Sequence, residues 1–263
     1  MGIVVLETFV NNILSFWKEI AALFPFAAEF INQSFRFFKT RQVAAIVLYR
    51  QILFTGYEAL SLTTLFAVAI GGIIILEGNL ILGNFGQSKL VYVILVSVIV
   101  REISNLLVAF LIIARSGTAI ASELGNMVIN HEVEALKSFG ISPIYYLVVP
   151  RVVGVVVSLV VLNIYFNIAG LLGGWFVSSL FTPIPFSQFM NGLLSEMGVL
   201  DLLSSMFKSV VFGFIIGFVS CHQGLQVAYS VTEIPQRTIK AVVHSLTLVI
   251  IFNILITTLF YLV

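Results

Sequence analysis

Five long apolar stretches set the pattern of hydrophobic and polar positions along the chain. They cover residues 59–82, 90–114, 152–180, 199–219 and 241–263. A helix needs roughly 20 apolar residues to cross the hydrocarbon core of a bilayer, and each stretch reaches about that length. The pattern therefore predicts an all-α integral membrane protein with five transmembrane helices.

The N-terminal region, residues 1–50, follows a different pattern. Between residues 9 and 38, apolar side chains recur at steps of three and four, as on one face of a helix. Charged residues such as Lys18 and Glu29 interrupt the apolar runs there before they reach the length of a span. We interpret the region as an N-terminal amphipathic helix lying in the membrane interface, which Pro25 could break. The alternative is a first spanning helix of poor quality. Residues 51–263 then form the membrane domain.

Composition supports the membrane assignment and excludes several functions. Hydrophobic residues make up 60% of the chain and charged residues 10%, whereas soluble domains have about 45–50% and about 25%. The net charge of +1 gives no reason to expect a nucleic-acid partner. Cys221 is the single cysteine, so no intrachain disulfide can form. The sequence contains no P-loop, no zinc-binding His-Glu-x-x-His spacing and no Gly-x-Ser-x-Gly elbow. We therefore expect no enzyme activity, no cofactor and no metal in this chain.

The basic residues are distributed unevenly between the two sides of the predicted spans. With the N-terminus in the cytoplasm, 10 of the 13 lysines and arginines fall on the inner side, and only Lys89 falls outside. This bias satisfies the positive-inside rule. It predicts a periplasmic C-terminus and outer turns at residues 83–86 and 183–196.

The longest inner connection, residues 115–151, carries a helical pattern of its own. Apolar residues recur at helical spacing over residues 118–139, and Gly140 followed by Pro143 is a typical helix stop. The pattern predicts one cytoplasmic amphipathic helix that carries Glu132 and Glu134. It is either a solvated loop helix or a coupling helix that docks into a partner subunit.

Three charged residues lie inside the predicted spans. Arg101 and Glu102 are in the second span and Lys208 is in the fourth. A charge at mid-membrane costs roughly 2.5–3.5 kcal/mol, so it normally faces a partner or a wet cavity. At ~1.5 Å per residue, Glu102 lies ~18 Å from the outer end of its span and Lys208 ~14 Å.

These depths predict an ion pair between Glu102 and Lys208. Arg101 lies about 100° around the helix from Glu102, which leaves it freer to meet an anionic lipid head group. In the alternative, Arg101 and Glu102 neutralise each other and Lys208 turns to water.

An ordered set of short motifs resembles the MlaE-type (YrbE-type) permeases of ABC transporters associated with MCE proteins. The matching stretches are Arg101–Glu102 and residues 114–119, 123–125, 134–136, 140–143, 146–151, 208–213, 220–224 and 241–245. Together they extend from about residue 50 to the C-terminus, and their order makes the set specific. Residues 51–263 therefore resemble an MlaE-type permease domain.

The resemblance implies a homodimer in the cell inner membrane that moves phospholipids or related lipids. It further implies a cytoplasmic ABC ATPase subunit that binds the ATP and a periplasmic MCE-domain protein, and it leaves room for a small cytoplasmic accessory subunit. The implied lipid-binding residues are Arg101, Glu102, Ile74, Leu82, Phe85 and Lys208. The residues implied to couple to the ATPase are Glu123, Glu132, Glu134, Leu136 and Gly140.

Two positions depart from the family pattern. The segment 231–240 lacks the glycine-rich run that is usual there, so Arg237 or Lys240 could take over a phosphate-contacting role. Asn253 stands in the last span where members usually carry aspartate, which weakens the case for a charged site on that helix. A different class of function, an ATP-independent transporter or channel, also agrees with five spans and buried charges.

Overall fold

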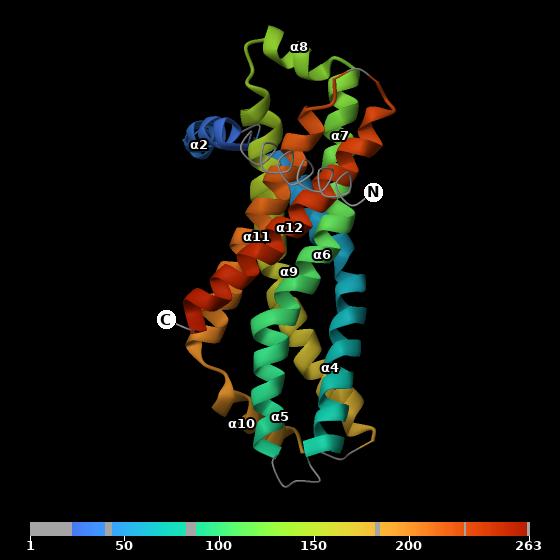
Figure 1. Cartoon of the computed structure of the whole chain (residues 1–263), viewed down its shortest axis with the longest axis vertical. Helices are drawn as coiled ribbons and strands as arrows, with labels where there is room; N and C mark the ends of the chain where they lie inside the picture. Colours follow the sequence, from blue (N-terminus) through green and yellow to red (C-terminus); the bar gives the residue numbers. More distant parts are fainter. Residues whose placement is uncertain (1–22, 40–43, 83–87, 182–184, 229, 262–263) are drawn as a thin grey trace, which may run out of the picture.

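The computed structural model describes residues 23–39, 44–82, 88–181, 185–228 and 230–261, and every element within these ranges is a helix (Figure 1). Five runs of helix are long and apolar enough to cross a membrane: Ile46–Gly78, Leu90–Ile129, Ile144–Ser179, Val199–Leu225 and Glu233–Tyr261. The prediction of an all-α membrane protein with five spans is confirmed. The runs extend beyond the predicted limits at the ends that the sequence predicts to face the cytoplasm, because the helices continue past the apolar stretches.

Most of the spans are built from more than one helical segment. The first combines α3 (Ala44–Thr55), the 3-10 turn η1 (Tyr57–Ala59) and α4 (Leu60–Leu82). The second joins α5 (Ser88–Leu95), the π-helix η3 (Val96–Ile103), α6 (Ser104–Ile112), the π-helix η4 (Ile113–Gly117) and α7 (Thr118–Ile129). The third joins the π-helix η5 (Ile144–Val148) to α9 (Val149–Ser179), and the last two are α11 (Val199–Leu225) and α12 (Glu233–Tyr261).

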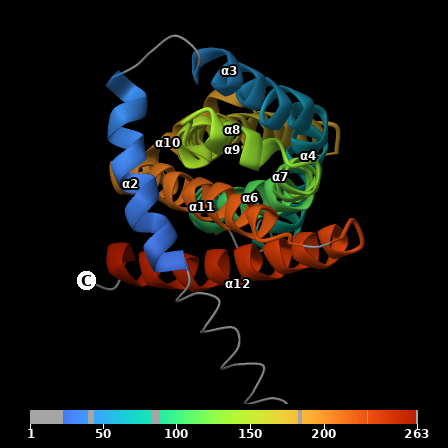
Figure 2. The same ribbon diagram turned by 90° about the horizontal axis from the view of Figure 1, so that it is seen from above.

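The helix α9 lies at the centre of the bundle (Figure 2). It packs against α4 on one side and α11 on the other, and α12 packs against α11. Its inner face is buried along most of its length, and it carries apolar residues together with Asn163 and Arg151. The bundle core therefore runs through α9, and polar side chains on this helix face other helices rather than lipid.

Glycines allow α4 and α9 to approach within backbone contact. A Cβ atom on Gly71 would lie 1.9 Å from the carbonyl oxygen of Gly170, and one on Gly174 would lie 2.7 Å from the carbonyl oxygen of Gly71. These glycines therefore serve close packing of the two helices. Small residues are the usual means of packing transmembrane helices this closely.

We expect Gly71→Ala to destabilise the protein by about 1–3 kcal/mol, the usual cost of overpacking, because the new methyl group meets rigid backbone. Thermal unfolding of the purified chain in detergent measures the effect. Ala69→Val is the matched control, since Ala69 lies on the same helix with an exposed side chain. Equal unfolding temperatures for the two variants and the parent chain would contradict the packing argument.

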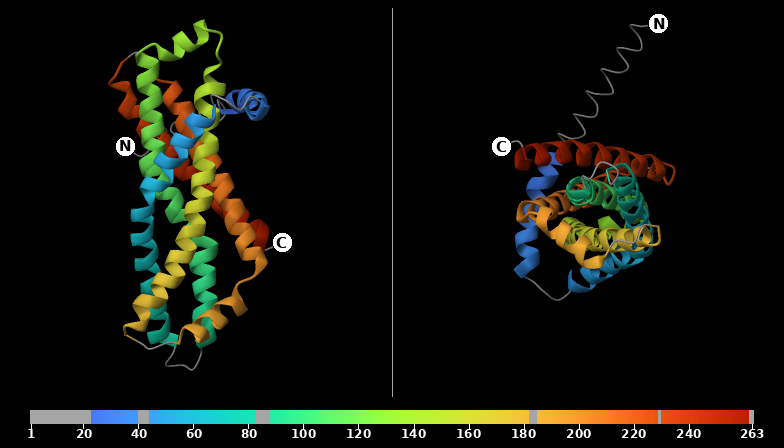
Figure 3. Two further views of the ribbon diagram at one scale, coloured as in Figure 1. Left: turned by 180° about the vertical axis from the view of Figure 1, so that it is seen from behind. Right: turned by 90° about the horizontal axis from the view of Figure 1, so that it is seen from below.

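The helix α2 (Leu23–Lys39) lies across the bundle rather than along it (Figures 1 and 3). Phe26 and Phe30 on one face pack against Phe218 of α11, with ring centroids 5.0 and 5.8 Å apart. Ile31 on another face is exposed. This arrangement fits the predicted interfacial helix. Pro25 lies within the first turn of α2, where proline is tolerated, and so does not break the described helix. The predicted part before residue 23 lies outside the described residues.

The predicted single helix over residues 118–139 is wrong. The first half, α7, is a continuation of the second span, and α8 (Glu132–Ser138) is a separate short helix. His131 between them has a left-handed backbone with φ 59°, which ends the regular helix. Gly140 at φ 73° ends α8 as predicted, with the amide of Ile141 donating to the carbonyl of Leu136 at 3.0 Å.

The predicted outer turns have different outcomes. Residues 83–86 lie outside the described part of the chain. Within residues 183–196, the structure contains the helix α10 (Phe186–Glu196) instead of a loop. Phe189 and Leu193, four residues apart on α10, are buried, and the Phe189 ring lies 6.1 Å from that of Tyr92 on α5. The spacing of these two apolar residues was the signal for a helix.

Candidate functional site

A buried ion pair joins the second and fourth spans. The ammonium group of Lys208 on α11 lies 2.8 Å from Oε1 of Glu102 on η3, and the Lys208 side chain is fully buried. The ammonium group also donates to the carbonyl oxygen of Arg101 at 2.9 Å. The predicted Glu102–Lys208 pair is confirmed. Pairing removes most of the cost of an ammonium group inside the bundle.

The last span completes the coordination of Glu102. Asn253 Nδ2 donates to Oε2 of Glu102 at 2.8 Å, and the Thr257 hydroxyl donates to Oε1 at 2.9 Å. The two donors are four residues apart and therefore lie on the same face of α12. Asn253 joins the cluster as a neutral donor. Sequence reasoning missed Thr257, although its spacing from Asn253 was the available signal.

Arg101 forms a second ion pair, with a residue that sequence reasoning did not identify. Its Nε lies 2.8 Å from Oδ1 of Asp201, and its guanidinium lies over the Tyr261 ring at 4.6 Å. The sequence predicted that Arg101 is freer than Glu102 to meet a lipid head group, and the pair with Asp201 limits that freedom. The prediction that Arg101 and Glu102 face different partners is confirmed, because adjacent residues of a helix point in different directions. The Arg101 side chain remains 32% exposed, so it is accessible to a ligand.

Four charges thus form two ion pairs within the bundle, and their sum is zero. Both Arg101 and Glu102 lie on the π-helix η3, within the second span. Such segments occur frequently at functional sites, because the wider helix displaces side chains from their regular positions. We refer to Arg101, Glu102, Asp201, Lys208 and Asn253 as the polar cluster.

A largely apolar pocket of about 300 Å³ is lined by Val100 and Leu202, the chain neighbours of Arg101 and Asp201. It lies between the second, third and fourth spans, and Val100 and Ser205 line it together with methionines, leucines and isoleucines. Two asparagines of α9, Asn163 and Asn167, also line it, and their carbonyl oxygens are buried without a hydrogen-bond partner among the described residues. An apolar cavity with a few polar groups is typical of a small-molecule or lipid site.

The chain also resembles known proteins along most of its length. Residues 48–259 match the family described as permease MlaE. The chain belongs to the MlaE permease family. A protein of Rickettsia prowazekii named probable ABC transporter permease is 29% identical over 215 residues, which is 82% of this chain and 83% of that protein. A protein of Synechocystis with the same description is 30% identical over 203 residues, 77% of each chain.

The chloroplast protein trigalactosyldiacylglycerol 1 of Arabidopsis thaliana is 29% identical over 161 residues, 61% of this chain and 46% of that protein. Membership in the family makes this chain a permease, that is, an integral membrane component of a transporter. The five spans agree with that assignment.

The apolar residues predicted for the lipid site of the permease are not all described. Ile74 lies on α4, half-buried, and packs against the apolar core. Leu82 is the last residue of α4, and the structure does not describe its side chain. Phe85 lies outside the described residues. Their proposed contacts with lipid stay predictions.

The residues predicted to couple the permease to an ATPase lie at one end of the bundle. Glu132 and Glu134 are exposed on α8, and Glu134 pairs with His131 at 2.9 Å. Leu136 is half-buried. Glu123 on α7 instead forms an ion pair within the chain, 2.8 Å from Arg151. Their contacts with a partner stay predictions.

The divergent segment before α12 holds a small polar network. Arg237 lies 3.1 Å from Glu233 and donates to the side-chain oxygen of Gln226 at 2.8 Å. Lys240 also has a partner in the described chain. A phosphate-contacting role for either residue stays a hypothesis.

Proposed function

We propose that this permease moves phospholipids or related lipids across or out of the membrane, as the transmembrane subunit of an ABC transporter. One observation carries the proposal: a partly exposed arginine belongs to a cluster of two ion pairs within the bundle, and residues next to Arg101 and Asp201 in the chain line an apolar pocket. A lipid has the matching chemistry, because its anionic head group suits a guanidinium and its acyl chain suits an apolar cavity.

The energy for transport is supplied by a separate subunit in this proposal. The relatives named as ABC transporter permeases support an ATPase partner that binds ATP. The exposed end formed by α7 and α8 suits the docking of that partner, because it projects beyond the rest of the bundle (Figure 1). This end would face the cytoplasm, with the C-terminus on the periplasmic side, in agreement with the distribution of basic residues.

The remaining parts of the assembly follow from the family resemblance. We propose a homodimer in the inner membrane that works with a periplasmic MCE-domain protein and leaves room for a small cytoplasmic accessory subunit. Lipid would pass between the membrane and the MCE-domain protein. Co-purification of the tagged chain, with mass spectrometry of bound proteins and lipids, tests each partner.

The decisive experiment measures lipid transfer from vesicles that contain the co-purified complex. Fluorescent phospholipid should move to acceptor vesicles when ATP is present. It should not move when a non-hydrolysable analogue replaces the ATP. Equal transfer without ATP, by the purified chain alone, would identify an ATP-independent transporter instead.

Arg101→Gln should lower the affinity for phospholipid about tenfold, since a hydrogen bond to a charged group contributes at least ~1.5 kcal/mol. Lipid retained by the purified protein, counted by native mass spectrometry, measures the effect. Asp201 keeps its bonds from the Gly198 amide and the Tyr261 hydroxyl, so the fold should survive. Lys137→Gln, which removes one positive charge from the exposed surface of α8, is the control. Unchanged lipid retention with an intact fold would remove Arg101 from the lipid site.

A further inference from the structure

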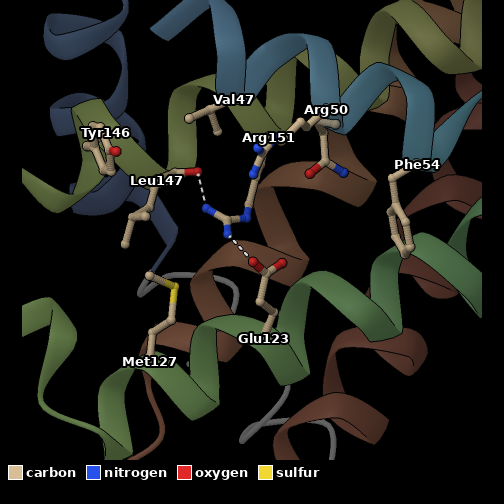
Figure 4. A pocket seen from close by; sticks show the side chains of 9 residues that line it. Val47, Arg50, Phe54, Glu123, Met127, Tyr146, Leu147 and Arg151 are labelled. Carbon is tan, nitrogen blue, oxygen red and sulfur yellow. Dashed lines mark hydrogen bonds and ion pairs between the residues drawn. The ribbon is translucent and has the colours of Figure 1, made fainter. Parts of the chain in front are cut away.

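A second pocket, of about 520 Å³, lies at the cytoplasmic end of the bundle and has a different chemistry (Figure 4). It is formed by α3, α7 and the junction of η5 with α9. Arg50, Arg151 and Glu123 line it together with apolar side chains. Along the second span, Glu123 is 22 residues from Arg101, or about 33 Å of helix. The pocket is therefore separate from the polar cluster.

Arg151 is the central group of this pocket. Its side chain is 6% exposed and extends into the space between α7 and η5 (Figure 4). One terminal nitrogen donates to the carbonyl oxygen of Leu147 at 3.0 Å, and the other donates to Glu123 at 2.8 Å. The third donor, Nε, is buried and has no partner within the described chain. A buried donor without an acceptor is costly, so an additional acceptor beside this guanidinium would be stabilising.

The charges that line the pocket do not balance. Arg151 is neutralised by Glu123, whereas Arg50 is exposed and forms no ion pair with any described residue. Two guanidinium groups against one carboxylate leave one positive charge. Guanidinium groups bind phosphate oxygens through paired hydrogen bonds, and arginine is favoured at such sites for that reason. The pocket is thus suited to a phosphate group.

The depth of the pocket matches that of lipid head groups. From Arg151 to Ser179, the outer end of α9, the helix is about 28 residues or about 42 Å long. A bilayer with its head groups is about 40–45 Å thick. The interfacial helix α2 packs against η5, which lines the pocket, and so lies at the same level.

We propose that this pocket binds a phosphate group between Arg50 and Arg151, carried by an anionic lipid of the inner leaflet or by a soluble phosphorylated molecule. Basic pockets between helices on the cytoplasmic side are a known way to hold anionic head groups. The site does not rest on the proposed transport function, because it lies about 33 Å along the second span from the polar cluster.

Binding to the purified full-length chain in neutral detergent tests the site. In one arm, native mass spectrometry counts the phosphatidylglycerol and phosphatidylcholine retained from an equal mixture. In the other, inorganic phosphate and glycerol 3-phosphate are titrated and the heat of binding is recorded. The parent chain should prefer phosphatidylglycerol if the source is a lipid, or bind the soluble phosphates if it is not.

Arg50→Gln should weaken binding about fivefold in whichever of the two assays detects a ligand, because one interfacial arginine contributes about that much affinity. Lys137→Gln removes the same charge from exposed α8 and should leave binding unchanged. Glu123→Gln should strengthen binding severalfold, because it raises the net charge of the pocket to two. A purely structural Glu123–Arg151 pair would not produce that gain.

Either responsive arm supports a phosphate site and identifies the source of the ligand. The proposal is overturned if the parent chain shows neither preference nor binding. It is equally overturned if Arg50→Gln and Lys137→Gln weaken binding to the same extent, because a general surface charge then explains the effect. Arg50→Lys, which keeps the charge, should restore part of the affinity, and its failure to exceed Arg50→Gln would also count against the site.

Discussion

Glu102→Gln is expected to destabilise the protein by about 3 kcal/mol. The change leaves the fully buried ammonium group of Lys208 without a counter-charge, and breaking a buried ion pair from one side costs about 3–5 kcal/mol. The lower end of that range applies because the Glu102 side chain is 31% exposed and water screens part of the interaction. Thermal unfolding in detergent and the yield of monodisperse protein measure the loss.

A double mutant separates the ion pair from other effects of the substitution. Glu102→Gln combined with Lys208→Met removes both charges, and we expect it to recover more than half of the stability that Glu102→Gln loses. Glu77→Gln is the control, since Glu77 is an exposed carboxylate on α4 and its substitution should change stability by less than about 0.5 kcal/mol. A double mutant no more stable than Glu102→Gln would show that Lys208 does not depend on Glu102.

Glu134→Lys is expected to reduce capture of the proposed ATPase partner at least tenfold and to abolish ATP-driven lipid transfer. Glu134 is 73% exposed near the start of α8, at the end of the bundle that we assign to coupling. Reversing a charge at a docking surface places like charges together, which costs several kcal/mol in a formed interface. Co-purification of the partner with the tagged permease measures the effect.

The fold should be little affected by this substitution. The side chains of Glu134 and His131 are both exposed, so the pair between them contributes little to stability. Glu77→Lys reverses an exposed charge at the opposite end of the bundle and should leave capture unchanged. Glu134→Gln, which removes the charge without reversing it, should give an intermediate loss. Normal capture and normal transfer by Glu134→Lys would exclude α8 from the coupling surface.

Features that depend on one helix, or on depth in the membrane, could be predicted without the structure. The number of spans follows from the length of apolar stretches, because each span must cross the same thickness of hydrocarbon. The Glu102–Lys208 pair follows from depth as well, since two opposite charges at similar depth in one bundle have few other partners. The end of α8 at Gly140 is a local property, because glycine adopts the left-handed backbone without strain.

Features that depend on how the helices rotate and cross could not be predicted from the sequence. Asp201 lies near the start of its span and could have faced water, so only the packing of α11 against η3 brings it to Arg101. The break at His131 was missed because the apolar spacing continues through residues 118–139, while the backbone at one residue ends the helix. The pocket around Arg151 joins Arg50, Glu123 and Arg151 from three separate parts of the chain.

The sequence by itself therefore determined the membrane assignment, the number of spans, the family and the buried ion pair between the second and fourth spans. Apolar length, charge depth and local motif order carry this information along the chain. Only the tertiary structure decided the partner of Arg101, the contribution of Asn253 and Thr257, and the pocket around Arg151. These depend on which face of each helix meets its neighbour, and that is set by the packing of the whole bundle, including the glycine contact between α4 and α9.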